Sequence, residues 1–239
     1  MRHTVSVVVP VFNEVSTVEK ALERLASIPV DKEIIAVDDG STDGTGALLD
    51  RLLQRGRIDL LLKHESNRGK GAAVRNAFEH ATGSVVVIQD ADLELDPAEI
   101  PRLLAPMEEE GALVVYGTRD LRIRRGMSLR QYLGNKVITF VTNLCTNLRL
   151  ADVETCYKMI RTDLLRTLTL TSDRFTIDPE LTIRLAQTGV SIREVPVSYR
   201  PRSHAEGKKI TWTDGVAALW SILRFSLLGP KPKRWDPTA

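Results

Sequence analysis

The first 90 residues alternate between short apolar runs and polar turns. Four runs have the length and the β-branched content of buried strands: Val5–Val11, residues 33–37, Leu60–Lys63 and Val85–Ile88. Apolar residues at helical spacing follow each of the first three turns, at 18–25, 48–53 and 72–81. Strand, polar turn and helix repeated in this way predict a parallel sheet with right-handed crossovers, so all the polar turns should lie at one edge of the sheet.

The remainder of the chain continues the α/β pattern. We expect helices at 100–107 and about 128–147, strands at 113–116, 156–160 and 192–199, and a helix capped by Asp178-Pro179 between the last two strands. Ser16 and Glu19 have the spacing of a capping box before the first helix. The predicted fold class is a single α/β domain over residues 1–211, with a mostly parallel central sheet and flanking helices. Residues 212–239 are expected to form an amphipathic helix and a basic tail.

Composition excludes several classes of protein. Hydrophobic residues make up 43% of the 239 residues and charged residues 27%, with a formal net charge of +2, which is globular and gives no overall bias toward nucleic acid. The two cysteines, Cys145 and Cys156, have neither metal-ligand nor disulfide spacing and are consistent with a reducing cytosol. We expect no signal peptide, and no apolar run approaches the roughly 18 residues of a transmembrane span.

Candidate chemistry begins where the fourth apolar run stops. Asp90 and Asp92 follow it directly, at the edge where open α/β sheets hold their ligands. Carboxylates spaced in this way offer the hard oxygen ligands that Mg²⁺ or Mn²⁺ prefers. The alternative is an acidic turn that starts the next helix, with Asp96 as its cap and Pro97 as its first residue. Neither the dinucleotide motif G-x-G-x-x-G nor a P-loop is present.

Several motifs together resemble a known family. V-V-V-P-V-F-N-E, V-D-D-G-S-T-D-G-T, G-K-G-A-A-V-R and Q-D-A-D-L-E resemble the GT-A nucleotide-sugar fold of glycosyltransferase family 2. Y-G-T-R, D-V-E-T-C-Y-K and E-G-K-K-I-T-W-T-D-G are similar to polyprenyl-phosphate glycosyltransferases of the dolichyl-phosphate mannose synthase type. The resemblance covers about residues 4–228.

The resemblance implies a role for each matching residue. It assigns the nucleotide pocket to Pro10, Phe12, Asn13, Glu14, Asp38 and Asp39, with Lys70 also on the donor side. It assigns the metal and the sugar diphosphate to Asp90 and Asp92, with Gln89 or Glu94 as a further ligand. It assigns the acceptor phosphate or the diphosphate to Arg119, Arg130, Arg202 and Lys209, with Asp92, Arg119 and Arg130 as the catalytic residues. Gly134 is a departure, because mannose synthases tend to have Ser there.

These roles define an expected reaction. We expect inverting, Mg²⁺- or Mn²⁺-dependent transfer of a hexose, mannose or glucose, from a GDP- or UDP-sugar to a polyprenyl phosphate. A phosphate monoester is mostly a dianion at neutral pH, so it can attack without a strong general base. The expected location is the cytoplasmic face of the membrane, with peripheral association.

Three alternatives remain open from the sequence. The same GT-A site could act on a soluble sugar or glycan, or the chain could be a nucleotide-sugar-binding or membrane-scaffold protein without catalysis. The apolar stripe from Val216 to Leu227 could pack into the core, or it could anchor at a membrane together with Trp220 and Trp235 beside the basic tail.

Overall fold

A seven-stranded sheet forms the centre of the protein. The structure is a computed structural model that describes residues 3–119, 129–202, 212–228 and 231–236. The strand order is β3-β2-β1-β4-β6-β5-β7. The strands are β1 (Val5–Val11), β2 (Lys32–Asp38), β3 (Leu60–Lys63), β4 (Val85–Ile88), β5 (Val114–Arg119), β6 (Lys158–Arg161) and β7 (Arg193–Val197).

The sheet is mixed through a single strand. β6 lies between β4 and β5 and runs antiparallel to both, whereas the other paired strands are parallel. The carboxyl ends of the parallel strands therefore share one edge, and the beginning of β6 reaches that same edge. This confirms the prediction of a mostly parallel sheet and brings residues 152–158 to the polar turns.

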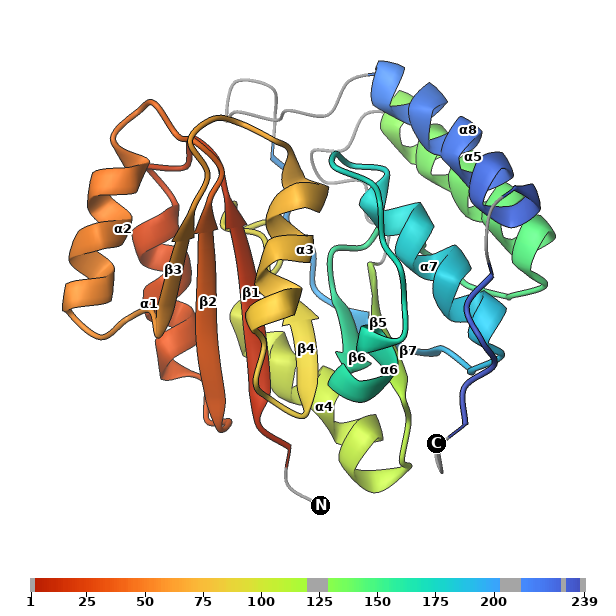
Figure 1. Cartoon of the computed structure of the whole chain (residues 1–239), viewed down its shortest axis with the longest axis horizontal. Coiled ribbons are helices and arrows are strands. Elements are labelled where there is room, and N and C mark those ends of the chain that lie inside the picture. Colours follow the sequence, from red (N-terminus) through yellow and green to blue (C-terminus); the bar gives the residue numbers. More distant parts are fainter. Residues whose placement is uncertain (1–2, 120–128, 203–211, 229–230, 237–239) are drawn as a thin grey trace.

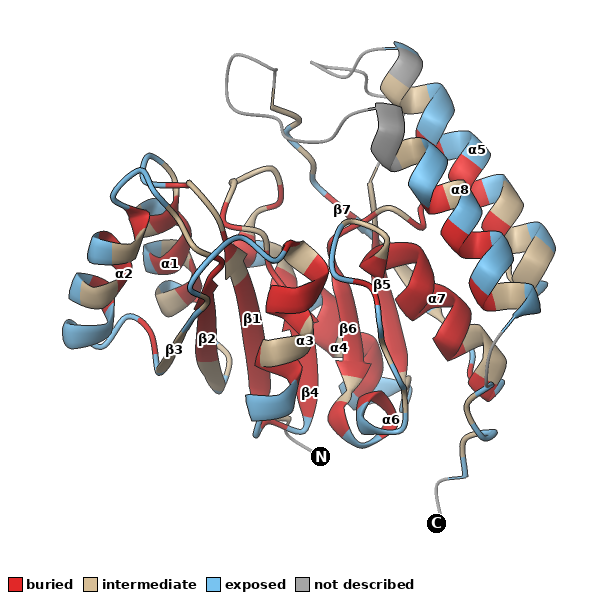
Figure 2. Ribbon diagram, turned by 45° about the horizontal axis from the view of Figure 1, so that its top comes forward, coloured by how far each residue is buried: buried red, intermediate tan, exposed pale blue. Residues whose placement is uncertain are grey.

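Helices cover both faces of the sheet (Figure 1). They are α1 (Val18–Ser27), α2 (Thr45–Gln54), α3 (Lys70–His80), the 3₁₀ helix η1 (Pro97–Glu99), α4 (Ile100–Glu109), α5 (Leu129–Thr146), α6 (Thr162–Arg166), α7 (Ile177–Thr188) and α8 (Trp212–Leu227). β4 is buried at every residue, as a strand between two helical layers must be. Figure 2 shows buried residues concentrated in the sheet and in the inner faces of α3 and α7.

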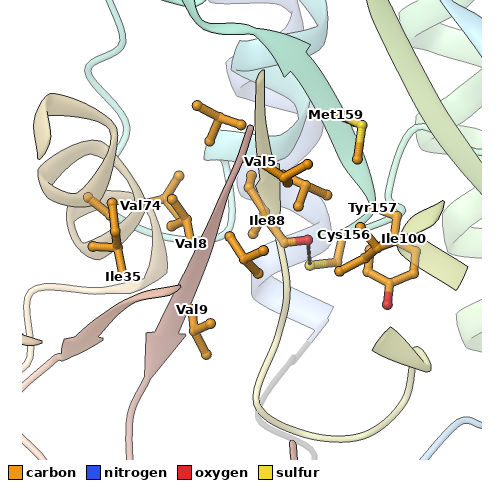
Figure 3. Packing of buried hydrophobic residues seen from close by; sticks show 14 of the residues in the cluster. Val5, Val8, Val9, Ile35, Val74, Ile88, Ile100, Cys156, Tyr157 and Met159 are labelled. Atoms are coloured by element: carbon orange, nitrogen blue, oxygen red, sulfur yellow. Dashed lines mark hydrogen bonds between the residues drawn. The ribbon is translucent and has the colours of Figure 1, made fainter. Parts of the chain in front are cut away.

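The core surrounds β1 and β4 (Figure 3). Val8 of β1 and Ile88 of β4 are fully buried or nearly so, and Cys156 donates from its thiol to the Ile88 carbonyl at 3.6 Å. Cys156 is therefore a core residue, as predicted. Cys145 is half-buried and packs against a smaller cluster formed by α5, α7 and α8.

Two expected helix caps do not form. α1 begins after Thr17, whose hydroxyl bonds to the Glu14 carboxylate at 2.8 Å, so the Ser16–Glu19 capping box is wrong. α7 begins at Ile177, which places Asp178 inside the first turn rather than at the cap. By contrast, the Asp96 side chain accepts from the Ala98 amide and caps η1 as the sequence suggested.

Candidate active site

The acidic turn after β4 lies at the carboxyl edge of the sheet. Leu93 takes a left-handed conformation with φ of 62°, and the Glu94 amide donates to Asp92 Oδ1 at 3.0 Å. The side chains of Asp90 and Asp92 keep 27% and 19% of their surface exposed. Both carboxylates are thus held in a fixed turn and remain within reach of a ligand.

Lys70, the first residue of α3, is paired with the first of these carboxylates. Its ammonium lies 2.9 Å from Asp90 Oδ1 and 3.8 Å from Asp178 Oδ2. Burial alone would lower the pKa of Lys70, but the carboxylates of Asp90 and Asp178 outweigh it and raise the pKa. The carboxylates therefore favour the charged form of Lys70 at this edge, and its donor-side role stays a prediction.

Arg202 bridges the ends of two strands. Its guanidinium forms a fork on Glu14, with both N–O distances at 3.0 Å, and its Nη2 lies 3.4 Å from Asp92 Oδ2. Its backbone amide donates to Glu94 Oε1 at 2.8 Å. A side chain predicted to bind phosphate is thus placed between the end of β1 and the acidic turn after β4.

Burial raises the pKa of Asp92 to about 7, and the nearby Asp90 and Glu94 carboxylates add to the rise, against the opposing effect of Arg202. The turn therefore holds more negative charge than its surroundings readily accommodate. A divalent cation relieves such repulsion, and carboxylate oxygens are the donors that Mg²⁺ and Mn²⁺ prefer. Asp90 and Asp92 thus fit a metal by charge and donor type.

The described residues do not complete a metal-binding set. Within 3–119, 129–202, 212–228 and 231–236, no three His, Cys, Asp or Glu side chains form a group that could hold a metal ion. Gln89, the predicted third ligand, is 1% exposed. Its carbonyl accepts from the Tyr157 hydroxyl at 2.5 Å, and its amide donates to the Asp90 carbonyl at 2.9 Å. The Gln89 side chain is therefore hydrogen-bonded to the core and to the backbone of the turn, and its role as a further metal ligand stays a prediction.

The predicted nucleotide residues at the ends of β1 and β2 form one connected turn. Asn13 has φ of 51°, its amide donates to Ser41 Oγ at 3.0 Å, and its side-chain oxygen accepts from the Thr42 amide at 2.8 Å. Asp38 accepts from the Ser41 amide at 3.0 Å. Pro10 lies near the end of β1, with Phe12 just beyond it. These contacts hold the loops after β1 and β2 together, and their role in binding a nucleotide stays a prediction.

Asp39, predicted to belong to the nucleotide pocket, is buried and hydrogen-bonded to the loop before α3. It is 2% exposed, and its carboxylate accepts from His64 Nδ1 at 2.6 Å, the Arg68 amide at 2.9 Å and the Gly69 amide at 2.8 Å. The Asn76 amide lies 3.1 Å from the other ring nitrogen of His64. Asp39 therefore anchors the 64–69 loop that leads into α3 and thereby positions Lys70.

Arg119, predicted to be catalytic, is occupied by a buried carboxylate. Its Nε and Nη2 lie 2.6 Å and 2.8 Å from the Asp152 oxygens, and Asn135 of α5 donates to the same carboxylate at 3.1 Å. Tyr199 stacks on the guanidinium, whose carbon lies 4.9 Å from the ring centroid. The fork that would grip a phosphate is already used, so a phosphate would have to share Arg119 with Asp152 or replace it.

Two predicted basic residues cannot be placed. Lys209 lies outside the described residues, as does the loop with Arg122, Arg124 and Arg125. Arg130 belongs to α5, but its side chain is also outside the described part of the chain.

A buried ion pair beneath the edge was not anticipated from the sequence. Lys158 of β6 is fully buried, and its ammonium lies 2.6 Å from Asp178 Oδ1. Burial opposes the charge on Asp178, but Lys158 and Lys70 hold the pKa of Asp178 below its usual value. Carboxylates and ammonium groups thus alternate from Asp90 through Lys70 and Asp178 to Lys158. The one signal in the sequence that could have indicated this pair is Lys158 itself, a charged residue at the start of the short strand β6.

Glu154 is the other residue that sequence reasoning missed. One of its carboxylate oxygens is shielded from solvent and has no hydrogen-bond partner among the described residues. Burial raises the pKa of Glu154 to about 7; Asp178 adds to the rise, while Lys158 and Arg119 oppose it. It lies four residues before β6, at the same edge as Asp90.

This sheet order, with an acidic turn after β4, defines an α/β protein of the GT-A type. The chain belongs to the family Glycosyl transferase family 2, whose profile matches residues 6–169.

Curated relatives are similar to this chain over most of its length. It is 32% identical over 213 residues to the undecaprenyl-phosphate 4-deoxy-4-formamido-L-arabinose transferase of Pseudomonas fluorescens (strain Pf0-1), covering 86% of this chain and 60% of the relative. It is 30% identical over 211 residues to the enzyme of that name from Salmonella choleraesuis (strain SC-B67), covering 85% and 62%. The chain thus spans about three fifths of the length of these relatives.

Solved structures share the fold. Glucosyl-3-phosphoglycerate synthase from Mycobacterium tuberculosis, in complex with phosphoglyceric acid, superposes with a TM-score of 0.72 at 20% identity, covering 95% of this chain and 81% of that one. The same synthase with Mn²⁺, UDP-glucose and phosphoglyceric acid gives a TM-score of 0.72 at 19% identity, with the same coverage. A third structure of that protein contains Mg²⁺ and UDP, with a TM-score of 0.70 at 19% identity, covering 95% and 81%.

None of the helices that the structure describes combines the length and apolar character needed to cross a membrane.

Proposed function

We propose that this protein transfers a sugar from a nucleoside diphosphate sugar to a polyprenyl phosphate, with inversion at the anomeric carbon. The observation that carries the proposal is the pair of carboxylates, Asp90 and Asp92, each already in contact with a cation, Lys70 and Arg202. A site of this kind suits a metal-bound diphosphate next to a second phosphate, because both signs of charge are fixed at one edge of the sheet. The curated relatives, named for transfer to undecaprenyl phosphate, support the acceptor class.

Asp90 and Asp92 would hold the divalent cation, Mg²⁺ or Mn²⁺, which when bound neutralises the leaving diphosphate. Lys70 and Arg202 contribute fixed positive charge on either side of those carboxylates, so the diphosphate is gripped by groups that need no reorganisation. Asn13 and Asp38 shape the loops of the proposed nucleotide pocket.

The reaction balances without a proton transfer. An oxygen of the acceptor phosphate dianion forms a bond to the anomeric carbon, and the bond from that carbon to the donor β-phosphate oxygen breaks. The electron pair leaves with the nucleoside diphosphate. The protein must therefore align two phosphates against their repulsion, a task that suits Arg119, Arg130 and Lys209 together with Arg202.

The sugar proposed is a hexose, mannose or glucose, because the motifs resemble the dolichyl-phosphate mannose synthase type. The arabinose derivative in the relatives' names makes a pentose the main competitor. The proposed location is the cytoplasmic face of the membrane, where a polyprenyl phosphate presents its head group.

A donor panel tests the proposal directly. Radiolabelled UDP- and GDP-sugars are incubated with undecaprenyl phosphate in Mn²⁺ or EDTA, and label is counted in the organic phase. We expect metal-dependent transfer that Asp92→Asn abolishes. Asp50→Asn, which removes an exposed carboxylate on α2, is the matched control and should retain activity. Label that never enters the organic phase would exclude the lipid acceptor.

A second candidate reaction follows from Glu154. A hydroxyl acceptor needs a general base, and a carboxylate with its pKa raised to about 7 is suited to that task at neutral pH. Its shielded oxygen at the edge of the sheet supports transfer to a soluble sugar or glycan. Glu154→Gln distinguishes the two reactions, because it should abolish transfer to a hydroxyl and spare transfer to a phosphate dianion.

A further inference from the structure

Exposed apolar side chains gather on two neighbouring helices. Of the twelve exposed large hydrophobic residues in the described chain, ten belong to α5, α8 or the residue after α8. We call them the docking face: Leu129, Leu133, Val137, Phe140, Leu144, Val216, Trp220, Leu223, Leu227 and Leu228. The other two are Val15, which precedes α1, and Leu53 of α2.

Spacing places these residues on one side of each helix. The exposed positions on α5 follow one another at intervals of four, four, three and four residues, and those on α8 at four, three and four. The opposite sides are apolar as well: Ile138 of α5 and Ile222 of α8 are buried with Ile183 of α7. A helix that is apolar on both sides needs a second apolar partner in addition to its own core.

The two exposed stripes form one surface. α5 and α8 lie side by side, as Figures 1 and 2 both show, and Figure 2 marks exposed residues along their outer sides. Large contiguous apolar patches on a protein surface mark interaction sites.

The charges around the docking face are basic. Residues 129–146 and 212–227 contain Arg130, Lys136 and Arg224 against a single acid, Asp214. Lys231, Lys233 and Arg234 are exposed in the tail that follows α8, which runs on beside the end of α7, where the Trp235 amide donates to the Thr188 carbonyl. An isologous contact between two copies would bring these like charges together, whereas an anionic lipid surface complements them.

The docking face is connected to the proposed acceptor site. Asn135, on the inner side of α5, bonds to Asp152, which in turn holds Arg119. Arg130 is the second residue of α5, and Lys209 lies three residues before α8, so both helices begin beside residues proposed to bind phosphate.

We propose that the docking face lies on an anionic lipid bilayer, with α5 and α8 in the plane of the interface. Trp220 and the leucines enter the boundary between head groups and acyl chains, and the basic residues contact lipid phosphates. The start of both helices then faces the head group of the acceptor lipid. The identity of that acceptor rests on the proposed function, but the contact with the bilayer does not.

The test uses the full chain with three variants. Leu144→Glu and Trp220→Glu are introduced singly and together, at side chains that are 74% and 65% exposed, so the fold is retained. Leu53→Glu, at 37% exposed on α2, is the matched control. Co-sedimentation is measured with phosphatidylglycerol and phosphatidylcholine vesicles. Oligomeric state is measured by light scattering without lipid, and transfer is measured to undecaprenyl phosphate in vesicles and to a short, water-soluble isoprenyl phosphate.

We expect wild type and Leu53→Glu to sediment with anionic vesicles, and each docking-face exchange to weaken that binding by about tenfold or more. The double variant should lose transfer to the vesicle acceptor and keep transfer to the soluble one. Unchanged sedimentation of the double variant overturns the proposal. A wild-type dimer that the double variant dissociates, with no vesicle binding by either, also overturns it, in favour of a second copy. Vesicle binding without transfer to either acceptor supports the docking face and refutes only the proposed function.

Discussion

The pair formed by Lys158 and Asp178 gives the sharpest prediction for stability. Asp178→Asn leaves the shape of the side chain nearly unchanged and removes the carboxylate that lies 2.6 Å from the Lys158 ammonium. The lysine side chain has no exposed surface, so water cannot replace the lost partner. The Thr155 carbonyl remains as an acceptor, but it carries no full charge.

The expected cost follows from this burial. Removing one partner of a buried ion pair destabilises a protein by about 3–5 kcal/mol, because the other charge is left uncompensated. Against a typical total of about 5–15 kcal/mol, this is a large share. Asp50→Asn is the control: Asp50 and Lys63 are each 47% exposed, and such a pair contributes about 0–1 kcal/mol.

Urea unfolding followed by circular dichroism measures the free energies. A double-mutant cycle with Lys158→Met completes the experiment, since the double variant Asp178→Asn with Lys158→Met removes both charges of this pair. We expect the double variant to be more stable than the sum of the single losses predicts. The reasoning is refuted if Asp178→Asn costs no more than Asp50→Asn, or if the two single losses simply add.

Three further predictions concern the site and its supports. Because burial raises the pKa of Glu154 from 4.5 to about 7, the folded protein binds more protons than the unfolded chain between those values, and its free energy of unfolding falls as pH rises through that range. In Glu154→Gln that fall should shrink by roughly 1–2 kcal/mol, as urea titrations at pH 5 and pH 8 would reveal; an unchanged slope contradicts the assignment. Gly71→Ala should destabilise by about 1–3 kcal/mol, because the added methyl meets the Ser172 carbonyl. Gly134→Ala, in α5 with nothing within 4 Å, should instead raise the free energy of unfolding by about 0.5–1 kcal/mol, which a higher melting temperature would show. Arg202→Lys cannot maintain the fork on Glu14 together with the contact to Asp92, so the KM for the donor should rise about tenfold. An unchanged KM would show that the bridge is not part of the donor site.

Sequence reasoning placed the strands and the edge well, and the resemblance placed the family. Val5–Val11 and Val85–Ile88 were predicted with the bounds that the structure has. Sequence reasoning did not identify hydrogen-bond partners that lie far apart along the chain. Gln89 bonds to Tyr157 and Arg119 to Asp152, 68 and 33 residues away, and neither partner was expected from the sequence; the ligand roles of Gln89 and Arg119 stay predictions.

The chain by itself determined where strands end and which polar residues gather there, because both depend on local apolar runs and on turn residues next to one another. Only the tertiary structure decided that β6 enters antiparallel beside β4, which brings Lys158 and Glu154 to the edge. It also decided that α5 and α8, which are far apart in sequence, form one exposed apolar face. The physical reason is that burial and ion pairing depend on tertiary contacts between segments that are distant along the chain, and a single sequence does not show those contacts.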